Sequence, residues 1–274
     1  MANGIFLWDH PVSPYSQKVR IALREKNIPF KLGTPSGVGS GNLASIDPKF
    51  SEANHRIEVP TLVDGDLKIF ESTIILEYLE DKYPETPLMP TDPAARAKAR
   101  MIEDVCDSQL EAINWGMGEI ENFKRSEGER AAYLKRQAMH QVKQVHQWLT
   151  EKLGDEEWFG GDRFGLADIC VWPMVNRSTS YGLEPEPGTG LHAWYERAKK
   201  RPSVRSVFEE FLAGTQGMGT KSADALQNGL IKREYRDHRL EWMIKSGGID
   251  IVLEGLKKSN IRFTWPYPLD SGPE

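Results

Sequence analysis

The feature that most constrains the fold is a change of pattern on either side of a proline-rich segment, residues 84–93, which contains four prolines. Before it, apolar runs of strand length alternate with helical patterns. After it, apolar residues recur at helical spacing. Because proline ends helices and central strands, this segment predicts a linker between an α/β unit, residues 1–83, and a helical unit that begins at residue 94.

Local signals divide the first unit into short elements. Ser13-Pro14 is typical of a helix start, since serine caps helices and proline suits the first helical position. Asp64-Gly65 between two apolar runs predicts a β-hairpin. The expected elements are a strand at 4–8, a helix from Ser13, a strand at 29–32, no assignment for 33–45, a hairpin at 60–70, and a helix capped by Ser72 that runs through Tyr83.

The second unit reads as helices alone, residues 94–213, followed by an extension, residues 214–274. Two long amphipathic stripes predict an antiparallel helix pair. A further helix is expected from Leu166 toward Tyr181, with two shorter ones after it and a break at 214–219. The stripes comprise Ile102, Val105, Cys106, Gln109, Leu110 and Ile113 in the first, and Leu134, Ala138, Val142, Val145 and Leu149 in the second.

Composition narrows the class of protein. Of the 274 residues, 39% are hydrophobic and 27% are charged with both signs intermixed, and the net charge is −5. No apolar run approaches the roughly 20 residues that span a bilayer, and the first residues lack a basic leader, so we expect a cytoplasmic protein outside membranes. The acidic balance argues against nucleic-acid binding. Cys106 and Cys170 lack metal-ligand spacing, so we expect two buried thiols and no metal.

Three segments of the first unit, residues 12–23, residues 58–62 and Glu71-Ser72, together resemble the glutathione-binding domain of cytosolic glutathione transferases. Residues 12–23 resemble the strand-to-helix turn where a Ser, Cys or Tyr approaches the glutathione sulfur. Residues 58–62 resemble the family's Val-Pro segment, whose proline is cis and whose valine backbone pairs with the cysteinyl unit. Glu71-Ser72 resembles the pair that holds the γ-glutamyl amine and carboxylate.

A fourth match lies in the helical unit, where residues 164–169 resemble the segment that caps a buried helix in the family. The resemblance therefore spans residues 4 to about 212. It implies a thioredoxin-like α/β domain, an all-helical second domain, and a homodimer formed through the first domain and the first long helices. It also implies a detoxification enzyme that uses glutathione as cosubstrate. The extension resembles no part of a minimal transferase, and we expect it to pack on the helical domain.

Ser13 is the expected catalytic residue of this serine-type site. A thiol with a pKa near 8.5 is mostly protonated at neutral pH, and a serine hydroxyl can donate a hydrogen bond to the sulfur anion. The start of the helix adds positive potential. On the Ser-Pro context alone a plain N-cap is the better reading, and the other motifs reverse that preference. Ser16 is a second candidate hydroxyl.

The remaining expected binding residues follow from the resemblance. Tyr15 is expected to contact the ligand, and Asp168 is assigned to structure. Two departures from the family pattern stand out: Gly165 occupies a usual Ser or Thr position, and Glu58 precedes Val-Pro where a neutral or basic residue is common. The anchor of the glycyl carboxylate therefore stays open among Arg56, His55 and Lys49. The full expected glutathione set is Tyr15, Arg56, Glu58, Val59, Pro60, Glu71 and Ser72.

The electrophile is expected between the two domains, against an apolar wall. Because Ser13 replaces the cysteine of thiol-transferring members, conjugation, isomerisation, dehalogenation or ether cleavage is favoured. The extension is hypothesised to fold back over this cleft. A rival interpretation is a non-catalytic binding module of the same fold, with the extension as its partner surface. Candidate substrate residues are Trp8, His10, Trp115, Met117 and Tyr181, and core packing explains the tryptophans and the methionine equally well.

Overall fold

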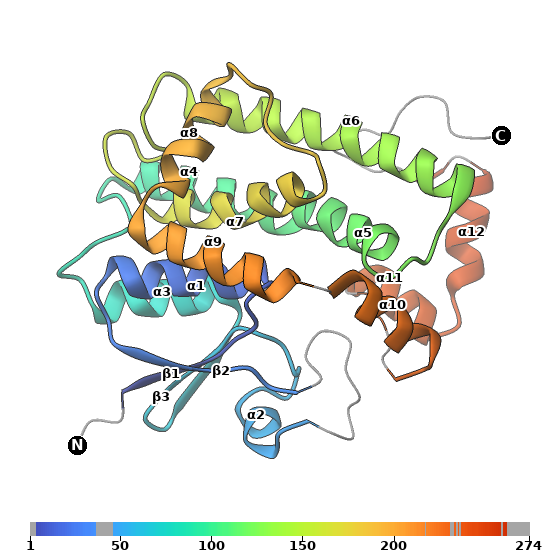
Figure 1. Ribbon diagram of the computed structural model, residues 1–274, viewed down its shortest axis with the longest axis horizontal. Helices are drawn as coiled ribbons and strands as arrows, with labels where there is room; N and C mark the ends of the chain where they lie inside the picture. The colour runs from blue at the N-terminus through green and yellow to red at the C-terminus, as the bar shows by residue number, and fades with distance from the viewer. Residues whose placement is uncertain are drawn as a thin grey trace.

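The first domain is built on a four-stranded sheet with the order β2-β1-β3-β4. β1 pairs in parallel with β2 and antiparallel with β3, which forms the expected hairpin with β4. The computed structural model describes residues 4–36, 46–216, 218–230, 233, 235, 237–258, 260 and 261 (Figure 1). Residues 37–45, within the segment without an assignment, lie outside the described part. The elements are β1 Ile5–Trp8, α1 Pro14–Glu25, β2 Phe30–Gly33, α2 Pro48–Ala53, β3 Thr61–Asp64, β4 Leu67–Phe70 and α3 Ser72–Lys82.

Strand alternation decides which face of the sheet each helix covers. Ile5 and Leu7 of β1 are buried in a core that α1 and α3 complete with residues such as Val19 and Leu79. Trp8 points to the other face, where its ring lies 5.4 Å from that of Phe50 in α2. Figure 1 shows α1 and α3 on one side of the sheet and α2 on the other.

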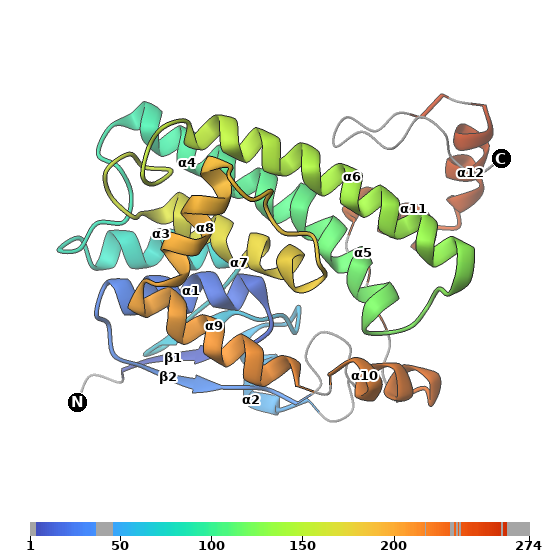
Figure 2. The ribbon, with the colours of Figure 1, turned by 45° about the horizontal axis from the view of Figure 1, so that its top comes forward.

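The second domain is all helical. α4 and α5 are joined by a single π-helical turn, and α6 runs back alongside them in both views (Figures 1 and 2). The expected combination of a thioredoxin-like α/β domain and an all-helical domain is confirmed. The elements are α4 Pro93–Val105, the π turn Cys106–Leu110, α5 Glu111–Glu121, α6 Gly128–Leu153, α7 Leu166–Ser180, α8 Gly190–Lys199 and α9 Pro202–Thr215.

α7 is the central helix, buried on nearly every side and packed against α1 of the first domain. Asp168 fixes its start. This carboxylate accepts from the Gly165 amide at 2.9 Å, the Phe159 amide at 3.1 Å and the Trp194 indole at 2.7 Å. Burial raises its pKa to about 6. An added Cβ on Gly165 would lie 2.7 Å from the Leu88 carbonyl oxygen, so glycine fits here and serine or threonine would not.

In its described part, the extension forms three short helices, α10 Met218–Gln227, α11 His238–Lys245 and α12 Ile249–Lys257. α10 packs against α9, and α11 and α12 lie at the end of the helical domain away from α8 (Figures 1 and 2). Large apolar side chains on both last helices are exposed, including Trp242 and Ile251. The part of the extension beyond residue 261 lies outside the described residues.

Three local expectations are wrong. Glu71, not Ser72, occupies the N-cap position of α3, and Ser72 is the first helical residue. The expected break at 214–219 starts too early, because α9 continues through Gly214 to Thr215 before α10 begins at Met218. Gly214 allows a close approach, since an added Cβ would lie 2.9 Å from the Pro11 side chain. Leu134 is 41% exposed, since Ala131 and Ala138 form the buried side of the first turns of α6.

Candidate functional site

The three expected glutathione-binding segments leave the sheet at one edge. Trp8 pairs with Thr61, and Thr61 pairs with Phe70, so these residues form the last row of the sheet. The chain segments that continue directly from this row therefore lie close together at one edge of the sheet. The segments that continue from it are the loop Asp9–Ser13 after β1, the peptide Val59–Pro60 before β3, and Glu71 after β4.

Ser13 is the N-cap of α1. Its backbone is extended, with φ −74° and ψ 119°, and its Oγ accepts a hydrogen bond from the Ser16 amide at 3.4 Å. The cap uses a lone pair of the hydroxyl, so the hydroxyl proton stays available to donate to another group. Capping and thiolate binding are therefore compatible roles. Ser16 itself is completely buried, which disfavours it as the hydroxyl that meets a ligand.

Tyr15 ties the two domains together. Its hydroxyl donates to the Asp107 carbonyl oxygen at 2.9 Å, and the Lys18 ammonium lies 5.6 Å from the centre of its ring. The ring also packs on the main core. These contacts give Tyr15 a structural role, and its contact with a ligand stays a prediction.

His10 lies in the loop before Ser13, and one of its ring nitrogens accepts a hydrogen bond from the backbone. The Val12 amide donates to His10 Nδ1 at 3.4 Å. Burial lowers the pKa of the imidazole, and the charges of Arg177 and Arg20 lower it further. The neutral form of the ring is therefore favoured, with Nδ1 as the acceptor for the Val12 amide.

Arg56 connects two of the expected binding segments. Its guanidinium lies 3.2 Å from a Glu58 oxygen and 2.5 Å from a Glu71 oxygen, and it stacks 5.7 Å from the centre of the Phe70 ring. His55 packs edge-on against the same ring at 5.4 Å. The cluster of Arg56, Glu58 and Glu71 carries one more negative than positive charge, which suits an ammonium group better than a carboxylate.

The start of α3 offers an anion site beside that cluster. Glu71 has φ 72°, a left-handed conformation that is uncommon for a residue other than glycine, and its side chain makes no cap hydrogen bond. The first amides of an α-helix have no partner within the helix. Ser72, which is 5% exposed, supplies a hydroxyl at the same point. A carboxylate can bind there. The peptide Val59–Pro60 is cis, as the resemblance implies.

Three candidates for the apolar wall have other packing partners. Trp8 lies against Phe50 beneath the sheet. Met117 is 3% exposed and belongs to a small cluster between α5 and α6. Tyr181 packs on that cluster, and its hydroxyl accepts from the Asn122 amide at 3.2 Å. Core packing accounts for the position of these side chains, and a role in substrate binding stays a prediction.

Trp115 in α5 contacts the extension. The Tyr235 ring lies edge-on to it with centroids 4.5 Å apart, and the Arg233 guanidinium lies 4.6 Å from its ring centre. Arg233 forms an ion pair with Glu119, which also binds Arg125 at 2.6 Å. The extension is thus attached to the same helix that carries the candidate wall residue.

Two polar connections near the site were not expected from the sequence. Lys18, fully buried in α1, bonds Glu103 at 2.9 Å and Asp107 at 2.5 Å across the domain boundary. The charge of Lys18 within an otherwise buried helical stripe is the signal that could have indicated a buried partner. Arg177 of α7 donates to the Val12 carbonyl oxygen, and no local pattern indicates that contact.

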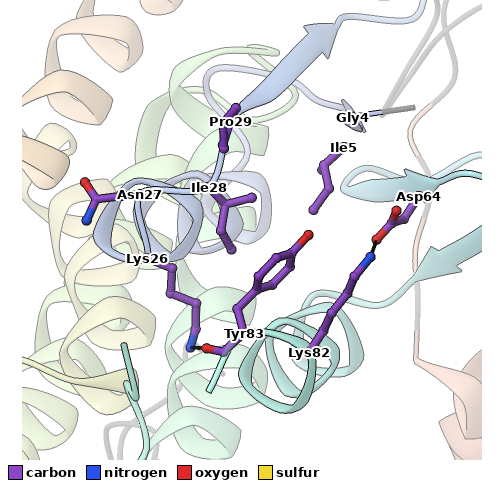
Figure 3. A pocket seen from close by; sticks show the side chains of 9 residues that line it. All are labelled: Gly4, Ile5, Lys26, Asn27, Ile28, Pro29, Asp64, Lys82 and Tyr83. Carbon is purple, nitrogen blue, oxygen red and sulfur yellow. Dashed lines mark hydrogen bonds and ion pairs between the residues drawn. The ribbon is translucent and has the colours of Figure 1, made fainter. Parts of the chain in front are cut away.

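A separate pocket lies at the opposite end of β1 from Ser13 (Figure 3). Its cations are already engaged: Lys82 pairs with Asp64, and Lys26 donates to the Tyr83 carbonyl oxygen at 2.9 Å. Within the described residues, no group of three or more His, Cys, Asp and Glu side chains could hold a metal ion. The described part also has no helix that is long and apolar enough to cross a membrane.

Comparison with known families gives two adjacent matches. Residues 7–87 match the model of the glutathione S-transferase N-terminal domain, and residues 106–202 match that of the C-terminal domain. The extension lies beyond both.

Individual relatives carry two kinds of name. The chain is 30% identical to glutathione S-transferase GstB of Escherichia coli over 74% of its own length and 97% of that protein. It is 32% identical to a stringent starvation protein A homolog of Haemophilus ducreyi, over 69% and 82% of the two chains. Rice GST1 in complex with glutathione is 26% identical, with a TM-score of 0.63, covering 79% of this chain and 99% of that one. FzlA from C. crescentus is also 26% identical, with a TM-score of 0.65 and 76% and 92% coverage.

Proposed function

The chain belongs to the glutathione S-transferase family, and from this premise we propose that it binds glutathione and activates its thiol at Ser13. The observation that carries the proposal is the edge of the sheet defined by Trp8, Thr61 and Phe70. Beyond this edge stand a helix start with a hydroxyl, a cis proline, and a second helix start flanked by carboxylates. Those are the groups that a tripeptide with one ammonium, two carboxylates and one thiol requires.

The hydroxyl of Ser13 donates to the sulfur anion and keeps its own proton. A hydrogen bond to a charged partner contributes about 1.5–3 kcal/mol. The positive end of α1 adds a further fraction of this energy. Together these interactions favour the thiolate at neutral pH, which is the form that attacks an electrophile.

The rest of glutathione extends along the edge of the sheet. The γ-glutamyl carboxylate binds the first amides of α3 and Ser72, and the γ-glutamyl ammonium lies near Glu71. The backbone of Val59 pairs with the cysteinyl unit. Since Arg56 already pairs with two carboxylates, Lys49 and His55, which are exposed, are better placed to meet the glycyl carboxylate.

The reaction class follows from the nucleophile. The chain's two cysteines, Cys106 and Cys170, are both completely buried, and burial raises the pKa of both thiols. Neither can form a mixed disulfide with glutathione in the folded protein. Attack by the glutathione thiolate on an apolar electrophile is therefore favoured, by conjugation, isomerisation, dehalogenation or ether cleavage.

The substrate groove is proposed to end at Trp115. Since a helical turn takes about 3.6 residues, Trp115 lies about two turns after Asp107, which binds Tyr15 and Lys18 next to the start of α1. Trp115 is covered by Tyr235 and Arg233. The extension then closes the far end of the groove and limits the length of the electrophile.

A homodimer is proposed through the first domain and α4. The large apolar side chains exposed there include Leu67 at 45%, Ile74 at 56% and Met101 at 45%. They come from β4, α3 and α4 respectively. A second copy of the chain would cover them.

The rival function is a non-catalytic binding module of the same fold. The relatives named stringent starvation protein A homolog and FzlA, whose names are not those of transferases, favour it. The engagement of Arg56 by two carboxylates favours it as well. The two functions differ in one requirement, since only the enzyme depends on the Ser13 hydroxyl.

The deciding experiment is a glutathione-dependent screen over aryl halides, epoxides, enones and aryl ethers. Wild type is compared with Ser13→Gly, which removes the hydroxyl yet retains most of the cap. Ser206→Ala, on the exposed side of α9, is the matched control. The enzyme should lose at least tenfold in kcat/KM in Ser13→Gly and nothing in the control. Equal turnover in all three proteins, or no turnover with any electrophile class, would support the binding module instead.

A further inference from the structure

The loop Asp9–Ser13, here called the serine loop, is fixed by hydrogen bonds from side chains to its backbone carbonyl oxygens. Arg20 and Gln17 of α1 donate to the Pro11 carbonyl oxygen at 3.0 and 2.9 Å. Arg177 of α7 donates to the carbonyl oxygen of Val12, the residue that precedes Ser13. The position of the Ser13 hydroxyl therefore depends on side chains from both domains.

α9 closes against the same loop. Gly214 approaches so near that an added Cβ would lie 2.9 Å from Pro11 and 3.1 Å from Val12. The Phe211 ring, one turn earlier, lies 5.5 Å from the guanidinium carbon of Arg177. Arg177 is thus fixed between an aromatic face and the backbone that it binds.

Arg20, Arg24 and Arg177, which lie next to the serine loop, differ in the carboxylates that they pair with. Arg20 pairs with Asp9 at 3.3 Å and with Glu210, which also binds Arg24. Among the residues that the structure describes, no carboxylate lies within ion-pair distance of Arg177. Three arginines therefore face two carboxylates, and the pKa of one of these, Asp9, is raised by burial. The cluster has a net positive charge.

The field of this cluster reaches the serine loop. Burial lowers the pKa of His10, which lies three residues before Ser13, and the charges of Arg177 and Arg20 lower it further. A field that opposes a positive charge on His10 favours a negative charge nearby. The thiolate that the proposed function requires is such a charge.

We propose that Arg177, which has no carboxylate partner among the described residues, is a positioning residue for Ser13 whose charge also stabilises the glutathione thiolate. It acts through the Val12 carbonyl, which it fixes, and through space. This inference rests on the proposed function, because it concerns the same bound sulfur.

The test measures the ionisation of bound glutathione directly. Thiolate absorbance near 240 nm is titrated against pH for the binary complex at low ionic strength, where screening is weak. Replacing Arg177 with Met retains much of its bulk and removes the charge, which should raise the pKa of the bound thiol by roughly 0.5–1 unit. The ionisation constant of the thiol then falls about three- to tenfold. Arg177→Lys should keep the wild-type value to within about 0.3 unit.

Two comparisons separate this role from general damage. Arg205→Met removes the same charge from an exposed position on α9 and should leave the titration unchanged. The nuclear magnetic resonance titration of His10, measured without glutathione, should shift to higher pH in Arg177→Met. A purely structural role would lower thermal stability in both Arg177 variants and leave the thiol ionisation of the complexes that form unchanged.

The possible results separate the inference about Arg177 from the proposed function. A bound thiol that titrates identically in wild type and Arg177→Met refutes the inference and leaves the proposed function intact. Wild-type protein that binds no glutathione refutes the proposed function itself, and the inference with it. If Arg177→Lys behaves like Arg177→Met, the role of the charge is also refuted.

Discussion

The buried cluster of Lys18, Glu103 and Asp107 should make a large contribution to the integrity of the two-domain fold. Lys18 is 0% exposed and Glu103 is 3% exposed, and their side chains join α1 to α4 at 2.9 Å. Lys18→Met would leave two carboxylates without their cation. Breaking a buried pair in this way costs about 3–5 kcal/mol. Thr73 still donates to Glu103 at 2.8 Å, so we expect the lower end, about 3 kcal/mol.

The assay is urea unfolding followed by circular dichroism. Lys82→Met, which breaks a pair with a 38% exposed lysine, is the control and should cost less than about 1 kcal/mol. Lys18→Met combined with Glu103→Gln and Asp107→Asn should recover at least half of the loss, because no uncompensated charge then remains. A loss below about 1 kcal/mol for Lys18→Met, or no recovery in the triple variant, would refute the reasoning.

The stability lost in Lys18→Met should depend on pH. Burial raises the pKa of Asp107 to about 6, although the charge of Lys18 lowers it. Without Lys18 this pKa rises further. A carboxyl whose pKa is higher in the folded than in the unfolded state favours folding at low pH, and this advantage is lost as the pH rises through the folded value. The deficit of Lys18→Met should therefore shrink between about pH 8 and pH 6.

Three further predictions test other parts of the fold. Gly165→Ala should destabilise by about 1–3 kcal/mol in thermal unfolding, because the new Cβ meets the Leu88 oxygen at 2.7 Å, whereas Gly116→Ala, with open space around it, should not. Deleting residues 231–274 should raise kcat/KM for bulky electrophiles at least threefold, and unchanged kinetics would contradict the closed groove. Ile74→Asp should shift sedimentation from dimer to monomer, and an unshifted profile would place the interface elsewhere.

Local patterns predicted individual elements, and the resemblance supplied the architecture. Asp64-Gly65 predicted the hairpin and Ser13-Pro14 predicted the start of α1, because each of these residues restricts the backbone by itself. α1 begins at Pro14 and the hairpin spans Thr61–Phe70, as expected.

Local patterns failed where a distant neighbour decides the outcome. Gly214 is typical of a helix break in the sequence, yet it lies within α9. Glycine is needed at this position because the Pro11 side chain leaves no room for a Cβ. Glu71 takes the cap position expected for Ser72, and its carboxylate pairs with Arg56. The ion pair between Glu119 and Arg233 joins residues 114 positions apart, and no periodicity encodes such a contact.

In the candidate site, too, some features could be predicted from the sequence and others depend on distant contacts. The edge where Ser13, Val59, Pro60 and Glu71 come together follows from strand order and register, which the hairpin and the resemblance already implied. The charges behind the serine loop do not, because Arg177 reaches Val12 across 165 positions of sequence.

The proposed function depends above all on a sulfur anion held by the Ser13 hydroxyl. The most direct measurement is a crystal structure of the protein with glutathione bound at neutral pH. We predict the sulfur within about 3.5 Å of Ser13 Oγ and the γ-glutamyl carboxylate at the start of α3. A bound tripeptide whose sulfur lies farther from that hydroxyl than from any other donor would contradict the central claim.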